Sequence, residues 1–214
     1  MENVIEPLRE LDWNDVDVVE AASRKSFELL TTQKYLLRRA LNAVTDNPDL
    51  TALCEHYDIL DKIVLHDDLQ SGVRLRLHIF GPGYHDRPHN HRWTYASHIL
   101  RGHYRHRLYG EAELGTEIDV AGLRAIHVRQ ERVGTSYALH HSAIHAVVAE
   151  PGTVSLVLRG PAIKDRFLVM DAKTGASWWQ YGAMTEPSDA AAKKRMSARR
   201  LRELIASLDE WQLV

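Results

Sequence analysis

The sequence predicts a mainly β fold, an antiparallel sandwich or barrel, with helical segments before and after it. Three observations support this class. Residues 1–60 have helical periodicity, residues 61–185 contain many short strand-like runs separated by glycine and proline turns, and residues 186–214 return to helical periodicity. The chain of 214 residues is long enough for one structural domain with a sizeable core.

The two helical segments have recognisable start signals. Asn14 or Asp15 can cap a helix in the N-terminal segment, and Asn47 followed by Pro48 is typical of another helix start. In the C-terminal segment, Ser188 is the expected N-cap. The expected apolar stripe there consists of Met196, Leu201, Leu204, Ile205 and Leu208.

The strand-like runs lie at 73–80, 94–100, 103–109, 124–130, 145–150, 153–159 and 165–171. In the first run, apolar and polar residues alternate. We expect Leu75 and Leu77 to face the helical cap, and Arg74, Arg76 and His78 to face the barrel interior. The alternative is an edge strand whose arginines are solvated.

Composition excludes several function classes. A net charge of −2 provides no strong field for nucleic acid or anionic membrane surfaces. The acidic N-terminus lacks the apolar core of a signal peptide, and no apolar run is long enough to span a bilayer. The single cysteine, Cys54, permits no disulfide within the chain, so a cytoplasmic location is expected.

Histidine is unusually clustered, because seven of the 13 histidines fall between His78 and His106. His89 and His91 are two residues apart, so on a strand both imidazoles point to the same side and can act as a pair of metal ligands. His145 is a third candidate ligand. His141 is a candidate acid, base or ligand-orienting residue.

We expect four further histidines to be structural or exposed. These are His98, His103, His106 and His140.

Two segments resemble the paired motifs of the cupin superfamily. Gly83, His89, His91 and Gly102 have the spacing of the first motif, and Gly134 with His145 follows the second. The second motif departs from the family at three positions, where His140, Ser142 and Ala149 stand in place of proline, glycine and asparagine. The resemblance covers roughly residues 70–175. It implies a double-stranded β-helix, or jelly-roll, barrel with an N-terminal helical cap (1–60), a barrel (61–185) and a C-terminal helix (186–214).

Tyr95 stands where the cupin motif usually has a carboxylate ligand. Three neutral imidazoles leave the full charge of a divalent ion and open positions for O2 and an anionic substrate. Imidazole suits iron, zinc, copper and nickel, so the ligands alone do not name the metal. Tyr95 itself either donates a hydrogen bond to a bound oxygen species or is a barrel aromatic with its hydroxyl at a wet end.

Within the cupins, residues 45–175 most resemble the cysteine dioxygenase family of thiol oxygenases, which use three histidines. This implies Fe(II) at His89, His91 and His145. Many members link a cysteine near the first motif to a tyrosine after the third histidine. Here Cys54 is far from the first position and Arg159 stands near the second, so a crosslink is not expected and L-cysteine is in doubt as the substrate.

The predicted substrate contacts are cationic or polar side chains that can recognise a carboxylate. They are Arg74, Arg76, His78, Lys62 and Arg159.

Three functions remain open at this point. The first is an iron(II) oxygenase that uses O2 to oxidise a small anionic metabolite, either a thiol or a specialised-metabolite scaffold. The second is a zinc- or manganese-dependent isomerase or hydrolase, and the third is a metal-free ligand-binding cupin. The resemblance is consistent with a homodimer. The sequence does not name the substrate, the number of oxygen atoms transferred or the pathway.

Overall fold

The computed structural model describes residues 1–115, 117–182 and 192–214, and within them the strands pair into antiparallel sheets. The strand orders are β1-β2-β3-β9-β4-β7, β6-β5-β8 and β10-β11. The bounds are β1 Glu55–Tyr57, β2 Leu60–Asp67, β3 Arg74–Phe80, β4 Tyr95–Arg101, β5 His103–Glu111, β6 His127–Arg132, β7 Ser136–Leu139, β8 Ala143–Ala149, β9 Val154–Arg159, β10 Arg166–Asp171 and β11 Ala176–Tyr181.

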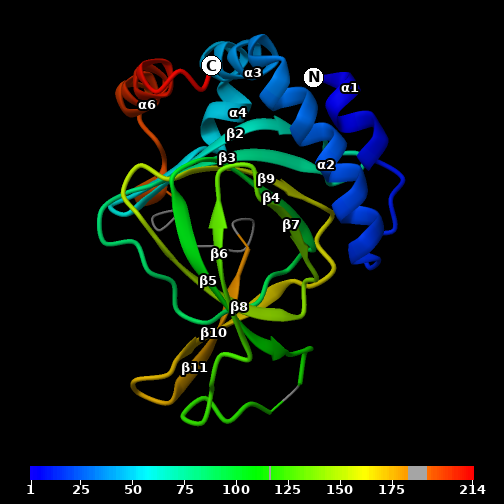
Figure 1. Cartoon of the computed structure of the whole chain (residues 1–214), viewed down its shortest axis with the longest axis vertical. Coiled ribbons are helices and arrows are strands. Elements are labelled where there is room, and N and C mark those ends of the chain that lie inside the picture. Colours follow the sequence, from blue (N-terminus) through cyan, green and yellow to red (C-terminus); the bar gives the residue numbers. More distant parts are fainter. Residues whose placement is uncertain (116, 183–191) are drawn as a thin grey trace.

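Two long ribbons pass from one sheet to the other. β4 continues into β5 through Gly102, and β8 continues into β9 through a short turn. β4 pairs with β9 in the six-stranded sheet, and β5 pairs with β8 in the three-stranded sheet. The two ribbons are therefore wound together along their length, as Figure 1 shows for the barrel below the helices. This winding is a double-stranded β-helix, so the predicted fold class is confirmed.

The turn between β4 and β5 requires glycine. Gly102 has a φ of +70°, and a Cβ atom there would lie 2.5 Å from Oγ1 of Thr153. Both the backbone conformation and the close approach of the neighbouring ribbon exclude a side chain.

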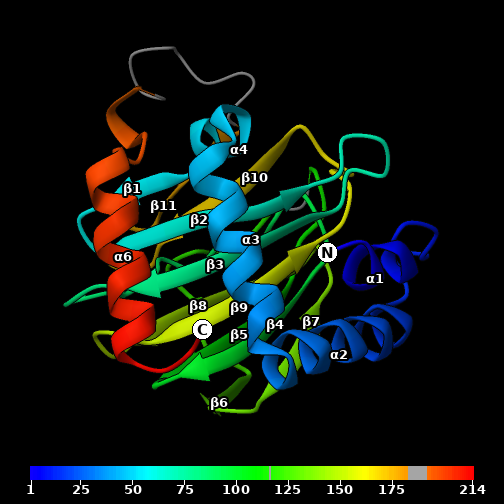
Figure 2. The same cartoon turned by 90° about the horizontal axis from the view of Figure 1, so that it is seen from above.

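Helices cover the outer face of the six-stranded sheet (Figures 1 and 2). Their bounds are α1 Glu2–Ile5, the 3-10 helix η1 Glu6–Leu8, α2 Val16–Thr32, α3 Lys34–Asp46, α4 Pro48–Ala52 and α6 Ala198–Glu210. The side chain of Asp15 accepts hydrogen bonds at the start of α2, and that of Asn47 does the same for α4, as predicted. None of the described helices combines the length and apolarity needed to cross a membrane.

β3 separates the main core from the barrel interior. Leu75 and Leu77 are fully buried in the core shared with the helices, together with Phe27 of α2 and Leu208 of α6. The alternate residues of β3 line a cavity inside the barrel. The two faces predicted for this strand are therefore present, and the edge-strand alternative is wrong because β2 and β9 pair with its two sides.

The C-terminal helix differs from its prediction. Arg195 forms an isolated bridge with Glu55, and α6 starts only at Ala198, with the side chain of Ser197 as its N-cap. The predicted cap, Ser188, lies outside the described residues. The sheet also begins earlier than the sequence indicated, already at Glu55.

Candidate metal centre

The segment that carries His89 and His91 is an extended stretch held between two strands. The backbone N–H groups of His89 and His145 each donate to the carbonyl oxygen of the other residue, at 2.9 Å. His89 also bridges to Val169 of β10. The prediction of a regular strand is therefore replaced by isolated bridges, but β8 still places His89 beside His145.

Asn90 fixes the backbone between the two ligand candidates. Its side chain is fully buried, donates to the carbonyl oxygen of Ala112 at 2.9 Å and accepts from the N–H of Leu168 at 2.8 Å. Its own N–H donates to the carbonyl oxygen of Leu168 at 3.2 Å. Because both neighbouring segments are bound through one amide, His89 and His91 are held in a defined direction.

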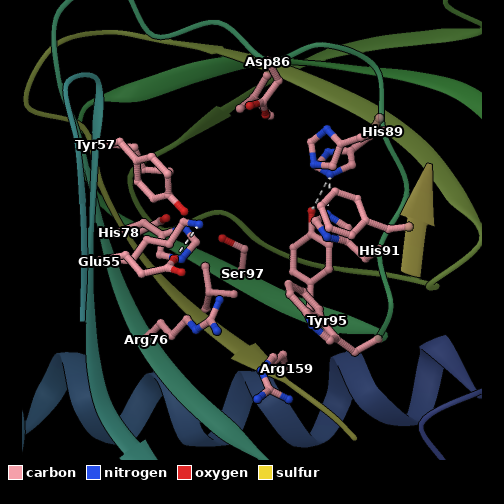
Figure 3. A pocket seen from close by; sticks show the side chains of 18 of the residues that line it. Glu55, Tyr57, Arg76, His78, Asp86, His89, His91, Tyr95, Ser97 and Arg159 are labelled. Carbon is pink, nitrogen blue, oxygen red and sulfur yellow. Dashed lines mark hydrogen bonds and ion pairs between the residues drawn. The ribbon is translucent and has the colours of Figure 1, made fainter. Parts of the chain in front are cut away.

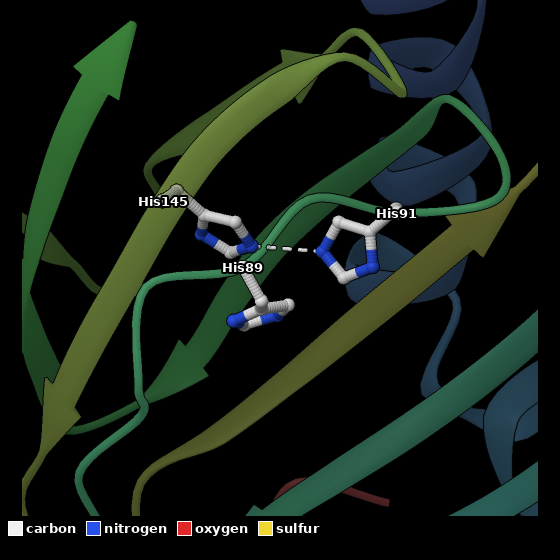
Figure 4. Close-up of side chains that lie close together, drawn as sticks. All are labelled: His89, His91 and His145. Carbon is white, nitrogen blue, oxygen red and sulfur yellow. Dashed lines mark hydrogen bonds between the residues drawn. The ribbon is translucent and has the colours of Figure 1, made fainter. Parts of the chain in front are cut away.

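His89, His91 and His145 meet on one wall of the cavity, with one ligand nitrogen from each within 4.8 Å of the others (Figure 4). Nε2 of His91 lies 2.8 Å from Nε2 of His145. Nδ1 of His89 lies 2.9 Å from the carbonyl oxygen of Arg87. A carbonyl oxygen only accepts, so Nδ1 of His89 holds the proton and its Nε2 presents a lone pair.

The protonation states of this cluster suit a cation. Burial, followed by the neighbouring histidines, holds the pKa of His145 well below its usual value; burial and then His89 do the same for His91. Both imidazoles are therefore neutral at pH 7, which is the form that binds a metal. The three residues fit an ion held by nitrogen ligands on one face, with the cavity on the other.

His106 supports His145 from behind. Nε2 of His106 is 3.0 Å from Nδ1 of His145, and its Nδ1 is 3.0 Å from a carboxylate oxygen of Glu131. His106 and Glu131 are both almost completely buried, and Arg129 forms an ion pair with the same carboxylate. This arrangement orients the ligand ring and increases its basicity. The expectation that His106 is merely structural or exposed missed this contact with a ligand candidate.

The hydroxyl of Tyr95 lies beside the three-histidine cluster. It lies 3.4 Å from Nε2 of His145, and the side chain is 5% exposed. Burial raises the pKa of Tyr95 well above its usual value, so the phenol keeps its proton. Behind it, the hydroxyls of Tyr104 and Tyr137 are 2.5 Å apart.

The cavity has a volume of about 510 Å³ and joins the histidines to several cationic side chains (Figure 3). Arg76, His78 and Arg159 line it, as does Trp93. The Trp93 ring is stacked on His91 with the centroids 4.6 Å apart. The guanidinium carbons of Arg76 and Arg159 lie 5.9 Å and 5.8 Å from the centroid of the Trp93 ring.

Two other predicted contacts already have partners on the cavity wall. Arg74 donates two hydrogen bonds to Asp67, at 2.7 Å and 2.8 Å. Lys62 donates to Glu55 at 3.0 Å. Both line the cavity, but each cation is at least partly neutralised by its carboxylate.

The remaining predicted residue, His141, does not line the cavity. It occupies the turn between β7 and β8, and its carbonyl oxygen accepts from the N–H of His91 at 3.2 Å. Its catalytic role stays a prediction. Cys54 is buried under the helices, donates to Leu50 and accepts from the N–H of Val64, and is likewise not among the cavity-lining residues.

Sequence reasoning missed Asn90, Trp93 and His106. Trp93 continues the alternation of His89 and His91, and this parity could have identified it. Asn90 and His106 had no comparable signal, because their partners are brought together only by strand pairing.

No protein-family model matches the chain, and no curated protein matches its sequence. Solved structures with a similar barrel include KdgF from a Halomonas species, at 16% identity and a TM-score of 0.39, covering 50% of this chain and 86% of that one. An RmlC-like cupin from Shewanella frigidimarina has 17% identity and a TM-score of 0.40, with 52% and 86% covered. L-ribose isomerase from Cellulomonas parahominis has 16% identity and a TM-score of 0.40, with 50% and 63% covered. These likenesses carry no activity over to this chain.

Proposed function

We propose that this chain is a mononuclear non-heme iron(II)-dependent oxygenase that uses O2 to oxidise a small anionic metabolite. The observation that carries the proposal is that one cavity contains both a converging three-histidine cluster and two half-buried arginines, neither of which forms an ion pair within the described residues. The choice of iron over other metals follows from the resemblance to the three-histidine thiol oxygenases.

The arginines support an anionic substrate. Arg76 forms no ion pair within the described part of the chain, and the Nε atoms of Arg76 and Arg159 have no hydrogen-bond partner. Burial, followed by neighbouring arginines, lowers the pKa of Arg76 to about 10 and that of Arg159 to about 9. Both groups are still charged at pH 7. Two half-buried like charges repel each other across the cavity, and a bound carboxylate would offset this cost through charge-assisted hydrogen bonds.

The size of the cavity favours a substrate larger than a simple amino acid. A volume of about 510 Å³ lies in the range of sites that enclose drug-sized ligands. Trp93 stacks on His91 and neighbours the guanidinium groups of both Arg76 and Arg159. We therefore infer that the substrate carries its anionic group at some distance from the group that reacts. A specialised-metabolite scaffold fits this description better than a short thiol.

The side chains around the cavity have distinct proposed roles. His89, His91 and His145 would hold iron(II), which would supply the redox chemistry between O2 and substrate. Arg76 and Arg159 bind and orient the anion. Tyr95 donates a proton or hydrogen bond from its neutral hydroxyl, and His106 keeps the ring of His145 in place.

Metal analysis after anaerobic purification, combined with oxygen-uptake assays, tests the proposal. We expect near one iron per chain and oxygen uptake with a panel of anionic thiols and larger carboxylates. His89→Ala and His145→Ala should each lose both iron and uptake, while His127→Gln, a change at an exposed histidine on β6, should keep both.

Three results would overturn the proposal. Oxygen uptake that survives His145→Ala would separate the activity from this site. Stoichiometric zinc or manganese without oxygen uptake would favour an isomerase or hydrolase that uses the ion as a Lewis acid. A chain that takes up neither metal nor oxygen would favour the ligand-binding alternative.

A further inference from the structure

A second group of metal-binding side chains lies outside the cavity. Glu113, His140 and His141 each offer one ligand atom, and these atoms lie within 4.8 Å of one another. None of the three lines the cavity that contains His89. Among the described residues, this is the only other group of histidine, cysteine or acidic side chains that meets this distance.

A turn brings the two histidines together. Neighbouring residues of a strand point to opposite faces, but β7 ends at Leu139 and β8 begins at Ala143, so His140 and His141 lie in the connection. The N–H of Ala143 donates to the carbonyl oxygen of His140 at 3.1 Å and closes this turn. The two imidazole centroids are consequently only 4.0 Å apart.

The carboxylate comes from the segment that follows β5. The N–H of Ala112 donates to the carbonyl oxygen of Ser142 at 2.9 Å, which ties this segment to the turn. Oε1 of Glu113 lies 3.9 Å from Nδ1 of His141. The Glu113 side chain is 56% exposed, so it can swing the short distance needed to share an ion with the histidines.

His141 has a buried nitrogen that no protein group satisfies. Its side chain is 7% exposed, and its Nδ1 has no hydrogen-bond partner. A buried polar atom left in this state is costly, and such atoms in native proteins commonly mark an ion or water site. Ser142 holds the ring of His140, because its backbone N–H donates to Nδ1 at 3.3 Å and its Oγ lies 2.7 Å from the same nitrogen.

The local charges permit a cation. The ammonium group of Lys164 donates to the carbonyl oxygen of His141 at 3.1 Å, and its positive charge opposes the binding of a cation. The negative charges of Glu111 and Glu113 act on His141 in the opposite direction, because both raise its pKa while Lys164 lowers it. Two carboxylates against one ammonium leave the surroundings negative.

We propose that Glu113, His140 and His141 form a second metal site, and that its ion is zinc(II). Two imidazoles and one carboxylate are a common ligand set for zinc, with water in the fourth position. The site is independent of the proposed oxygenase activity. It lies directly behind the first site, because the carbonyl oxygen of His141 accepts from the N–H of His91. A bound zinc ion would therefore stiffen the turn against which His91 is held.

Equilibrium dialysis of the full chain against zinc, followed by metal analysis, tests the proposal. After any bound iron has been removed with a chelator, the unsubstituted protein should bind two zinc ions per chain. Glu113→Gln removes the charge of an exposed side chain, with little effect on folding, and should reduce the count to one. Glu117→Gln, a change at an exposed glutamate in the same region, is the matched control and should leave the count at two.

A complementary variant removes the first site instead. His89→Ala combined with His145→Ala should still bind one zinc ion, and adding His141→Asn should abolish this binding. The proposal is overturned if Glu113→Gln binds as many zinc ions as the unsubstituted protein, or if the His89→Ala, His145→Ala variant binds none. Retention of zinc by the triple variant would also overturn it. Because the readout is zinc stoichiometry, these outcomes are separate from the failure of the iron-oxygenase proposal.

Discussion

The contact between His106 and His145 predicts an effect on metal binding without loss of a ligand. His106→Leu removes the partner of Nδ1 of His145 and leaves the carboxylate of Glu131 buried with less compensation. Changes of this kind typically weaken metal affinity about 10- to 100-fold. We expect such a loss in a competition assay with a chromophoric chelator.

A histidine on the same strand provides the control. His103→Gln changes a partly exposed residue of β5 whose ion pair is with Glu150, so metal affinity should stay the same. Unchanged affinity in His106→Leu would show that His106 does not position the ligand. Partial rescue by His106→Gln, which keeps a hydrogen-bonding side chain, would separate orientation from packing.

The hydroxyl of Tyr95 predicts a second effect at the residue scale. Tyr95→Phe removes only the oxygen that lies 3.4 Å from Nε2 of His145. We expect metal content to stay unchanged and kcat for oxygen uptake to fall by about 10-fold or more, since a positioned proton donor commonly contributes at least that much. Tyr95→Phe with an unchanged kcat would indicate that Tyr95 is only a packing residue.

Arg76 and Arg74 are neighbouring cations on one face of β3, and we predict opposite effects on stability. Arg76 is half-buried, its Nε has no hydrogen-bond partner, and it forms no ion pair in the described chain, so Arg76→Met should raise the free energy of unfolding by about 1 kcal/mol while weakening substrate binding. Arg74→Met leaves the carboxylate of Asp67 without its ion-pair partner and should lower the free energy of unfolding by about 3 kcal/mol. Urea unfolding of both variants measures this contrast. A loss of stability in Arg76→Met would mean that its charge is compensated within the free protein.

At the scale of elements, β3 connects stability and function through its two faces. Leu77 is fully buried against the helices, so Leu77→Ala should cost about 2–5 kcal/mol of unfolding free energy. Metal stoichiometry of the folded fraction should be unaffected, because the residue faces away from the cavity. Leu69→Ala is the control, since Leu69 is 88% exposed, and should cost less than about 0.5 kcal/mol. Equal costs for the two changes would contradict the assignment of faces.

The same strand illustrates what could be predicted from the sequence. Alternating residues in β3 identified both of its faces, because a strand has a period of two and one side is apolar. The spacing of His89, His91 and His145 identified three residues that do come together. The start of α6 was misplaced, because helical periodicity continues N-terminal to the cap at Ser197 and does not reveal that Arg195 bridges to Glu55.

Contacts between distant segments were beyond prediction. Asn90 joins segments near residues 112 and 168, and His106 meets Glu131 and His145 across two strand pairs. No local period marks such residues, since their roles depend on the register of β5 with β6 and β8. Asn90 and His106, which no sequence pattern assigned to the site, therefore hold the ligand candidates in position.

For the whole molecule, buried histidines predict loss of stability on mild acidification. Burial lowers the pKa of seven histidines, and those of His78, His91 and His145 lie well below the usual value. Above about pH 6.5 both folded and unfolded histidines are neutral, so their contribution to stability is fully present. As the pH falls below this value, these histidines bind protons in the unfolded chain but stay neutral in the folded chain, so the free energy of unfolding decreases.

The size of this effect can be measured in metal-free protein. Each histidine that stays neutral in the folded state costs about 1.4 kcal/mol between pH 7.5 and pH 5.5. We expect up to about 4 kcal/mol from His78, His91 and His145 together, because burial keeps all three neutral in the folded chain. Unfolded carboxylates titrate near pH 4, so they contribute little in this window. Urea unfolding at the two pH values, with His78→Leu reducing the difference and His127→Gln leaving it unchanged, tests the prediction. Equal stability at both pH values would mean that the buried histidines are already charged in the folded chain, and they could then not serve as neutral metal ligands without first losing a proton.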